Sequence, residues 1–111
     1  MNYKIIPVEK FKKEAKQLIK KYPSLKSELA VLNQMLSANP TSGTSLGNNT
    51  YKIRISIKSK GKGKSGGARV ITYMVTEKKE VYLLTIYDKA ELETIDNKTL
   101  LKIISSIFEK E

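Results

Sequence analysis

The chain has 111 residues, is 40% hydrophobic and carries a formal net charge of +10, which predicts one compact basic domain spanning residues 1–111. It contains no cysteine and no histidine, so disulfides and thiolate metal sites are excluded and we expect neither a metal nor another cofactor. The first residues lack a signal peptide and no apolar run approaches the ~20 residues that span a bilayer, so we expect a cytoplasmic protein.

The first part of the chain predicts one strand and two helices. Residues 3–8 are typical of a short strand. Apolar residues then recur three or four positions apart from Val8 to Tyr22 with lysines between them, which indicates an amphipathic helix with a solvated basic face. Pro23 ends this helix and Ser24 is a candidate cap for a second one, whose leucines run from position 25 to position 36.

The second part predicts three consecutive strands and a last helix. Residues 39–50 are rich in Pro, Gly, Ser, Thr and Asn and predict a loop. Apolar and basic residues alternate over 51–58, whereas residues 68–76 and 81–87 are apolar on both faces, as central strands are. Asp96 is a candidate cap for the last helix. Its inward side chains are expected to be Leu100, Leu101, Ile104, Ile107 and Phe108.

The predicted order is therefore β-α-α-β-β-β-α. This order indicates an α+β fold in which an N-terminal helical hairpin packs on a small antiparallel sheet and a C-terminal helix follows. No internal repeat or linker interrupts it.

The charge is concentrated in the middle of the chain. No Asp or Glu occurs from Leu29 to Thr76, whereas the acidic residues of the two ends alternate with lysines and are typical of an ordinary helix surface. A field of one sign attracts polyanions. A lipid-binding segment would interleave bulky apolar residues with its lysines, but residues 58–67 interleave glycine and serine, so nucleic acid is favoured over a membrane.

Two groups of basic residues are candidates for phosphate contact. The lysine-glycine hairpin between two strands can contact phosphates without reading bases, or can serve only as a solvated loop. Its candidate residues are Lys58, Lys60, Lys62 and Lys64, with Tyr73 on the next strand. Lys52 and Arg54 project from the polar face of the first of the three strands, and Arg69 begins the second. Arg69 is expected to pair with Asp88, with Glu91, or with a phosphate.

The end of the last strand carries the remaining candidates, Tyr87 and Lys89. Side chains there are expected to be precisely placed yet exposed. Tyr87 is interpreted either as a base-stacking residue or as the edge of the core, and Lys89 as an anion-stabilising cation or a surface lysine. RNA cleavage does not require histidine, because the 2′-hydroxyl can attack the adjacent phosphate when cations stabilise the developing charge and another group moves protons.

A specific combination of motifs carries a resemblance to a known family. The combination is a lysine-glycine hairpin, then Gly-Gly-x-Arg, then Tyr-Leu-Leu-x-Ile-Tyr-x-Lys, within residues 52–93. This segment resembles the RelE/ParE superfamily of toxin–antitoxin toxins, most closely its HigB-type branch. The resemblance implies a RelE-like fold, an mRNA endonuclease acting on the ribosome, and a cognate antitoxin of the helix-turn-helix HigA type.

The resemblance also implies roles for individual residues. Lys52 and Arg54 match basic residues of the strand, Arg69 matches an arginine that contacts the scissile phosphate, and Lys89 matches a second arginine. The tyrosine of the final segment in RelE falls near Ile95, which cannot move a proton, so Tyr87, Lys52 and Lys58 stay open as proton-transfer candidates. Two alternative functions also stay open: a ParE-type gyrase inhibitor, and a disabled relative that only binds RNA or its antitoxin.

Overall fold

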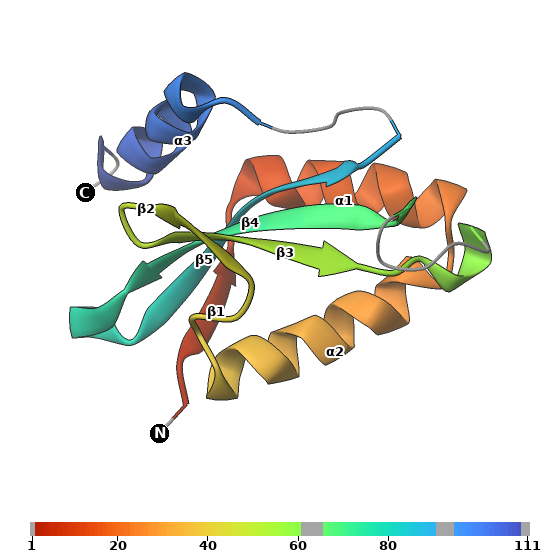
Figure 1. The fold of residues 1–111 in the computed structure, drawn as a ribbon, viewed down its shortest axis with the longest axis horizontal. Coiled ribbons are helices and arrows are strands. Elements are labelled where there is room, and N and C mark those ends of the chain that lie inside the picture. Colours follow the sequence, from red (N-terminus) through yellow and green to blue (C-terminus); the bar gives the residue numbers. More distant parts are fainter. Residues whose placement is uncertain (1, 61–65, 91–94, 110–111) are drawn as a thin grey trace.

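The structure is a computed structural model that describes residues 2–60, 66–90 and 95–109 (Figure 1). The described elements follow the order β-α-α-β-β-β-β-α. The helices are α1 (Glu9–Lys21), α2 (Leu25–Ala38) and α3 (Asn97–Glu109), and the strands are β1 (Lys4–Pro7), β2 (Thr44–Gly47), β3 (Thr50–Ile55), β4 (Ala68–Val75) and β5 (Glu80–Asp88). Within the described ranges, no helix is long and apolar enough to cross a bilayer.

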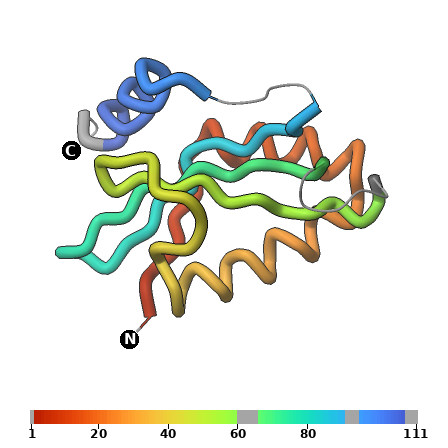
Figure 2. Tube along the Cα trace, viewed as in Figure 1, coloured from red at the N-terminus to blue at the C-terminus, as the bar shows by residue number. Residues whose placement is uncertain are grey.

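The strands form one sheet in the order β1-β5-β4-β3-β2. β2, β3, β4 and β5 pair antiparallel with their neighbours, whereas β1 runs parallel to β5, so that the two segments lie side by side although they are far apart in the sequence (Figure 2). The predicted α+β class is confirmed, but the prediction of an antiparallel sheet is wrong at β1. An alternation of residue types shows that a segment is a strand and does not show its direction relative to its neighbour.

A strand also lies where the composition of residues 39–50 predicts only loop. β2 pairs with β3 through a tight turn at Asn48 and Asn49, whose φ angles are 50° and 62°. Asparagine tolerates this left-handed conformation, which a two-residue hairpin turn of the favoured hand requires. The Gly-Asn-Asn sequence of this turn was therefore the signal for a hairpin.

Helices cover the two faces of the sheet (Figure 1), and the two faces bury different sets of apolar residues. The α1–α2 hairpin covers one face, where Phe11, Leu32 and Ile53 belong to one buried apolar cluster. α3 covers the other face through Leu100 and its neighbours. This arrangement explains why β4 and β5, the inner strands, are apolar on both faces. Leu101, predicted to point inward, is 53% exposed instead.

The two predicted helix caps differ in outcome. The carboxylate of Asp96 accepts a hydrogen bond of 2.7 Å from the Thr99 N–H, and this backbone bond lowers the pKa of Asp96. Ser24 occupies the cap position of α2, but its hydroxyl donates to Glu28 rather than to the helix backbone. Glu28 also accepts from the Ser56 hydroxyl and the Lys58 N–H, so it connects α2 to the exit of β3.

A β-bulge lies in the middle of β5. Ile71 pairs with Thr85 and Thr72 pairs with Leu83, so Leu84 is an extra residue without an opposite partner. An extra residue reverses the alternation of the side chains that follow it. Tyr87 consequently lies on the α3 face, together with Leu84. Without the bulge it would lie on the face of the α1–α2 hairpin.

β1 is shorter than β5, so the second half of β5 has no strand beside it on that edge. The carboxylate of Glu14 on α1 occupies this edge. It accepts hydrogen bonds of 2.7 Å from the Thr85 hydroxyl and 3.3 Å from the Ile86 N–H, and Lys10 contacts both Glu14 and Thr85. The acidic residues at the ends of the chain are thus not all ordinary surface, since Glu14 bonds to β5 and Glu28 bonds to the segment that follows β3.

We expect Gly67→Ala to lower the free energy of unfolding by roughly 2–3 kcal/mol, because a Cβ at this position would overlap the Ile55 carbonyl oxygen where β3 and β4 approach. Thermal denaturation measures the change. Ser27→Ala, an exposed position on α2, is the control and should leave the melting temperature within about a degree. Equal melting temperatures for the two variants would contradict the close approach.

Candidate nucleic-acid interface

Three candidate residues form a row across the three inner strands of the sheet, each one residue from the end of its strand. Arg54 on β3 lies directly opposite Arg69 on β4, and Arg69 lies opposite Tyr87 on β5. Paired residues of neighbouring strands project to the same face. The row therefore brings together two guanidinium groups and a phenol from three different strands, on the α3 side of the sheet.

The two arginines create an electrostatic cost. Arg54 is exposed, whereas Arg69 is only 3% exposed and its guanidinium donates a hydrogen bond of 3.1 Å to the Ala68 carbonyl. Burial is the main cause that lowers the pKa of Arg69, and the positive charge of Arg54 lowers it further. Like charges directly opposite on neighbouring strands destabilise a sheet, and an anion between them would remove the repulsion.

Tyr87 is buried beside Arg69. Its hydroxyl oxygen is buried without a hydrogen-bond partner in the described part of the chain. Burial raises the pKa of Tyr87, and the nearby charge of Arg69 opposes this shift. The phenol is therefore protonated at neutral pH and is a hydrogen-bond donor without an acceptor. The expectation that the end of the last strand is exposed is wrong for Tyr87, which is 8% exposed, and for Asp88, which is 1% exposed.

Asp88 is separated from the row by the alternation of β5. It pairs with Ala68, and its carboxylate accepts hydrogen bonds from the Tyr22 hydroxyl at 3.3 Å and from the Ala90 N–H at 2.9 Å. These contacts direct it toward the α1–α2 hairpin rather than toward Arg69. Glu91, the other acidic partner considered for Arg69, lies outside the described residues.

The other basic candidates lie around the row. Lys52 is two residues from Arg54 along β3, on the same face, and is half-buried opposite Ile71. Lys89 follows β5, where its N–H donates to the Gly67 carbonyl at 3.1 Å, and its side chain is half-exposed. Lys58 begins a short 3-10 helix, Lys58–Lys60, and is exposed. Lys62 and Lys64 lie outside the described residues.

Tyr73 belongs to a different environment from the arginine row. It is half-buried on β4 and packs with the apolar residues that α3 covers. Ile95, which stands near the position of the RelE tyrosine, packs against the same cluster. The α3 face of the sheet therefore carries both an apolar zone and the Arg54–Arg69 pair, and Tyr87 belongs to the first and lies opposite Arg69 of the second.

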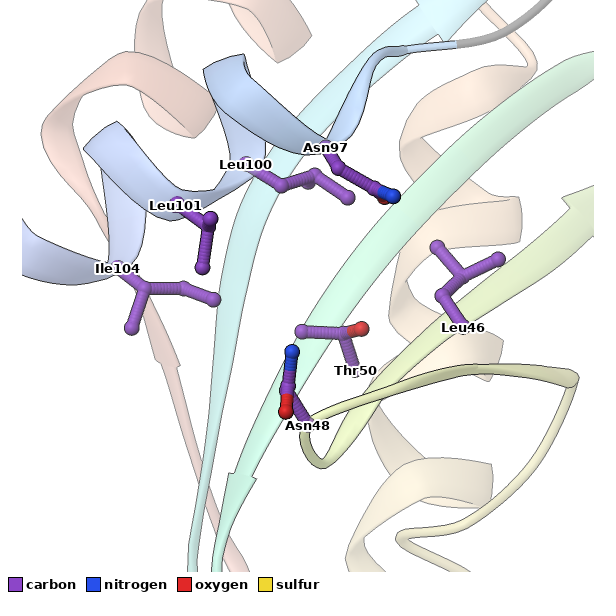
Figure 3. Close-up of a pocket in the computed structure, with 7 residues that line it drawn as sticks. All are labelled: Leu46, Asn48, Thr50, Asn97, Leu100, Leu101 and Ile104. Atoms are coloured by element: carbon purple, nitrogen blue, oxygen red, sulfur yellow. The ribbon is translucent and has the colours of Figure 1, made fainter.

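The hollow between α3 and the β2–β3 turn is small and lacks charge (Figure 3). Its volume is about 140 Å³. Figure 3 shows Leu100 and Ile104 of α3 facing Asn48 and Thr50 across it. The only polar groups are amides and a hydroxyl, so this hollow has no group that could move a proton at neutral pH.

A hollow of about 290 Å³ between α2 and β3 was not predicted. Val31 and Met35 line it and are 65% and 38% exposed, which makes them two of the three large apolar side chains that stand exposed in the described ranges. Both are apolar residues outside the leucine stripe of α2, and their position there was the available signal. Exposed apolar groups of this kind mark contact surfaces for a partner.

No family model matches the sequence. Among solved structures, the fold is similar to the E. coli toxin RelE, in the free state of a mutant with two arginines changed to alanine. The TM-score is 0.62 and the sequence identity is 20%, over 84% of this chain and 90% of that chain. The chain therefore has a RelE-like α+β fold, and this level of identity shows the fold alone.

Tyr87→Phe should raise the free energy of unfolding by about 1 kcal/mol, because it removes a buried hydroxyl that lacks a partner. Burial raises the pKa of Tyr87, so ionising the phenol costs the folded state stability as the pH rises above about 10. Tyr87→Phe should therefore lose less stability than the parent protein between about pH 9 and 11. Denaturant unfolding across that range measures both effects, with Tyr51→Phe, a half-buried position, as control. A destabilised Tyr87→Phe protein would show that the hydroxyl has a structural partner.

Proposed function

We propose that this protein is a toxin of a type II toxin–antitoxin system, of the HigB type, that cleaves mRNA on the ribosome in the cytoplasm. The observation that carries the proposal is the opposed Arg54–Arg69 pair beside the protonated phenol of Tyr87. The two like charges repel each other in the free protein, and a phosphate bound beside them lowers that repulsion. The RelE-like fold supports the same proposal.

The proposed reaction uses the 2′-hydroxyl of the RNA as the nucleophile. The 2′-oxygen attacks the adjacent phosphorus while its proton passes to water, and the bond from phosphorus to the 5′-oxygen breaks. Arg69 and Arg54 stabilise the charge that develops on the phosphoryl oxygens. Tyr87 donates its proton to the leaving 5′-oxygen and is reprotonated from water. The products are a 2′,3′-cyclic phosphate and a free 5′-hydroxyl.

Burial of the row determines the order of events. Arg54 is the exposed member of the row, so it meets the RNA first. Arg69 and Tyr87 are buried, so the RNA reaches them only when the side chains that cover them move. In this proposal the ribosome places the RNA so that these side chains move, and cleavage therefore depends on the ribosome.

Arg69→Gln should reduce mRNA cleavage by about 10²–10³-fold, because it removes a charge from the transition state while the fold is retained. The measurement is a reverse-transcription map of mRNA 5′ ends in a purified translation system, with and without ribosomes. We expect cuts in register with codons only when ribosomes are present. Lys98→Gln, an exposed position on α3, removes the same charge elsewhere and should cut at the parental rate.

A folded Arg69→Gln protein that cuts like the parent would refute the role of Arg69. Intact mRNA with the parent protein would refute the interferase proposal itself. Induction of the DNA-damage response in that case would indicate a gyrase inhibitor, and no response of either kind would indicate a disabled relative.

The cognate antitoxin, a helix-turn-helix protein of the HigA type in this proposal, has a docking place beside β3. The Met74 N–H bonds to the Asn49 carbonyl at 2.9 Å, so every second residue of β3 from Asn49 onward bonds to β4. Arg54 falls between these residues, and its N–H and C=O therefore point away from β4. β2 pairs only as far as Lys52, so no strand of the described chain covers Arg54 there. An extended segment can add to such an edge.

The side chains around this edge define the segment that would fit. Val31 and Met35 on α2 offer apolar contacts, and Arg54 and Lys58 give the rim a positive charge. The acidic group nearby, Glu28, is already bonded to Ser56 and the Lys58 N–H. The complementary partner is an extended segment that alternates acidic and apolar residues, and it would block Arg54 from RNA.

The Val31→Glu, Met35→Glu double variant should bind the antitoxin at least about tenfold more weakly, because two apolar contacts become acidic repulsion. Titration calorimetry measures binding, and the 5′-end map should show unchanged cleavage that added antitoxin no longer suppresses. Leu101→Glu makes the same kind of change on α3, where the side chain is 53% exposed, and should bind normally. Tight binding by the double variant would place the antitoxin elsewhere.

A further inference from the structure

A row of lysines follows the outer face of α1, on the opposite side of the molecule from the arginine row. Lys12, Lys16 and Lys20 are spaced four residues apart, so they lie on one face of the helix about 6 Å from one to the next. Lys26 of α2 joins them around an open hollow of about 530 Å³. We call these four residues the lysine ridge, and all four are exposed.

The charge of the lysine ridge is almost uncompensated. α1 contains two acidic residues, and Glu14 is turned toward β5, where Lys10 also contacts it. Glu9 lies 3.5 Å from Lys12, but both side chains are more than half exposed, so this ion pair contributes little. In the ranges that the structure covers, no acidic group lies within 4.0 Å of Lys16, Lys20 or Lys26.

The surroundings of the ridge favour RNA over a protein helix. An amphipathic helix needs exposed apolar side chains to bury, and none of the exposed large apolar residues of the described chain, Val31, Met35 and Leu101, lies at this hollow. Its apolar floor consists of buried or half-buried side chains such as Phe11 and Ile19. Phosphates need only the ammonium groups, which lysine stems hold out in water.

Base-paired RNA fits the ridge better than a single strand does. Single strands are bound by stacking their bases on aromatic side chains. Phe11 is 4% exposed and therefore offers no stacking surface at the hollow. A double-stranded RNA presents its phosphates on a stiff surface and is recognised by shape and charge. A straight row on a rigid helix can meet that surface with little loss of conformational freedom.

We propose that the lysine ridge binds the phosphate backbone of base-paired RNA and holds the protein while the arginine row acts on a single strand at the other face. The inference rests on the proposed function only for the source of the duplex, which would be the RNA of the ribosome. Duplex binding itself does not depend on cleavage. In this proposal the lysine ridge adds affinity for RNA, and the arginine row carries out cleavage.

The test compares two variants with the same change in charge. Lys12, Lys16 and Lys20 are changed to Gln in the ridge variant, and Lys4, Lys98 and Lys102, which are exposed on β1 and α3, are changed to Gln in the control. Fluorescence anisotropy follows binding to a blunt RNA duplex of about 16 base pairs, the length that double-stranded RNA-binding domains span. Measurements run from 50 to 200 mM salt.

Each lost phosphate contact reduces the slope of log affinity against log salt by about 0.7–0.9. The ridge variant should therefore lose about two to three units of slope, and the control less than about one. In the ribosome assay, the ridge variant should need about tenfold more protein for half-maximal cleavage and reach the parental maximum rate.

Equal slopes for the two variants would overturn the proposal. A loss confined to a single-stranded RNA of the same length, or a loss of antitoxin binding with duplex binding intact, would also overturn it. If the parent protein does not cut mRNA at all, the proposed function fails, whereas the anisotropy result still decides the ridge.

Discussion

The antiparallel pair of β4 and β5 positions every other element of the molecule. Both strands are buried on their two faces, β3 and β1 are added at their outer edges, and the helices cover the two faces of the same pair. The extra residue Leu84 belongs to this pair, and it decides which face receives Tyr87. A change in the pairing would therefore separate the phenol from Arg69 even if every strand and helix survived.

Most of the fold was predictable because its elements have periodic apolar patterns. The three helices, the first strand and the inner strands were placed to within a few residues, and Asp96 was identified as a cap because short-range chemistry determines it. β2 was missed because its four residues carry no alternation, and the parallel direction of β1 was missed because pairing partners lie far apart in sequence. Leu101 was wrongly predicted to point inward, because only some of the apolar side chains of α3 face the sheet.

The candidate site was predictable in composition but not in geometry. Arg54, Arg69 and Tyr87 were recognisable as chemically competent residues, yet their common row depends on strand register and on a bulge, neither of which composition reveals. Burial was also misjudged, because strand ends are ordinarily exposed and here α3 packs over the sheet beside Tyr87. The result is a site in which a guanidinium and a phenol are held away from water before any substrate arrives. Preorganisation of this kind reduces stability and favours a function that involves anions.

The two sides of the sheet differ in how their main-chain hydrogen-bonding groups are covered. On one side, β1 is short and ends in Pro7, and beyond it Glu14 accepts a hydrogen bond from the Ile86 N–H of β5. On the other side, β3 extends past β2 and its main chain stays available at Arg54. A sheet with two available edges can polymerise without limit, because each added chain offers a new edge. A segment added beside Arg54 occupies the stretch of β3 that β2 leaves unpaired, so this place takes one added segment at a time.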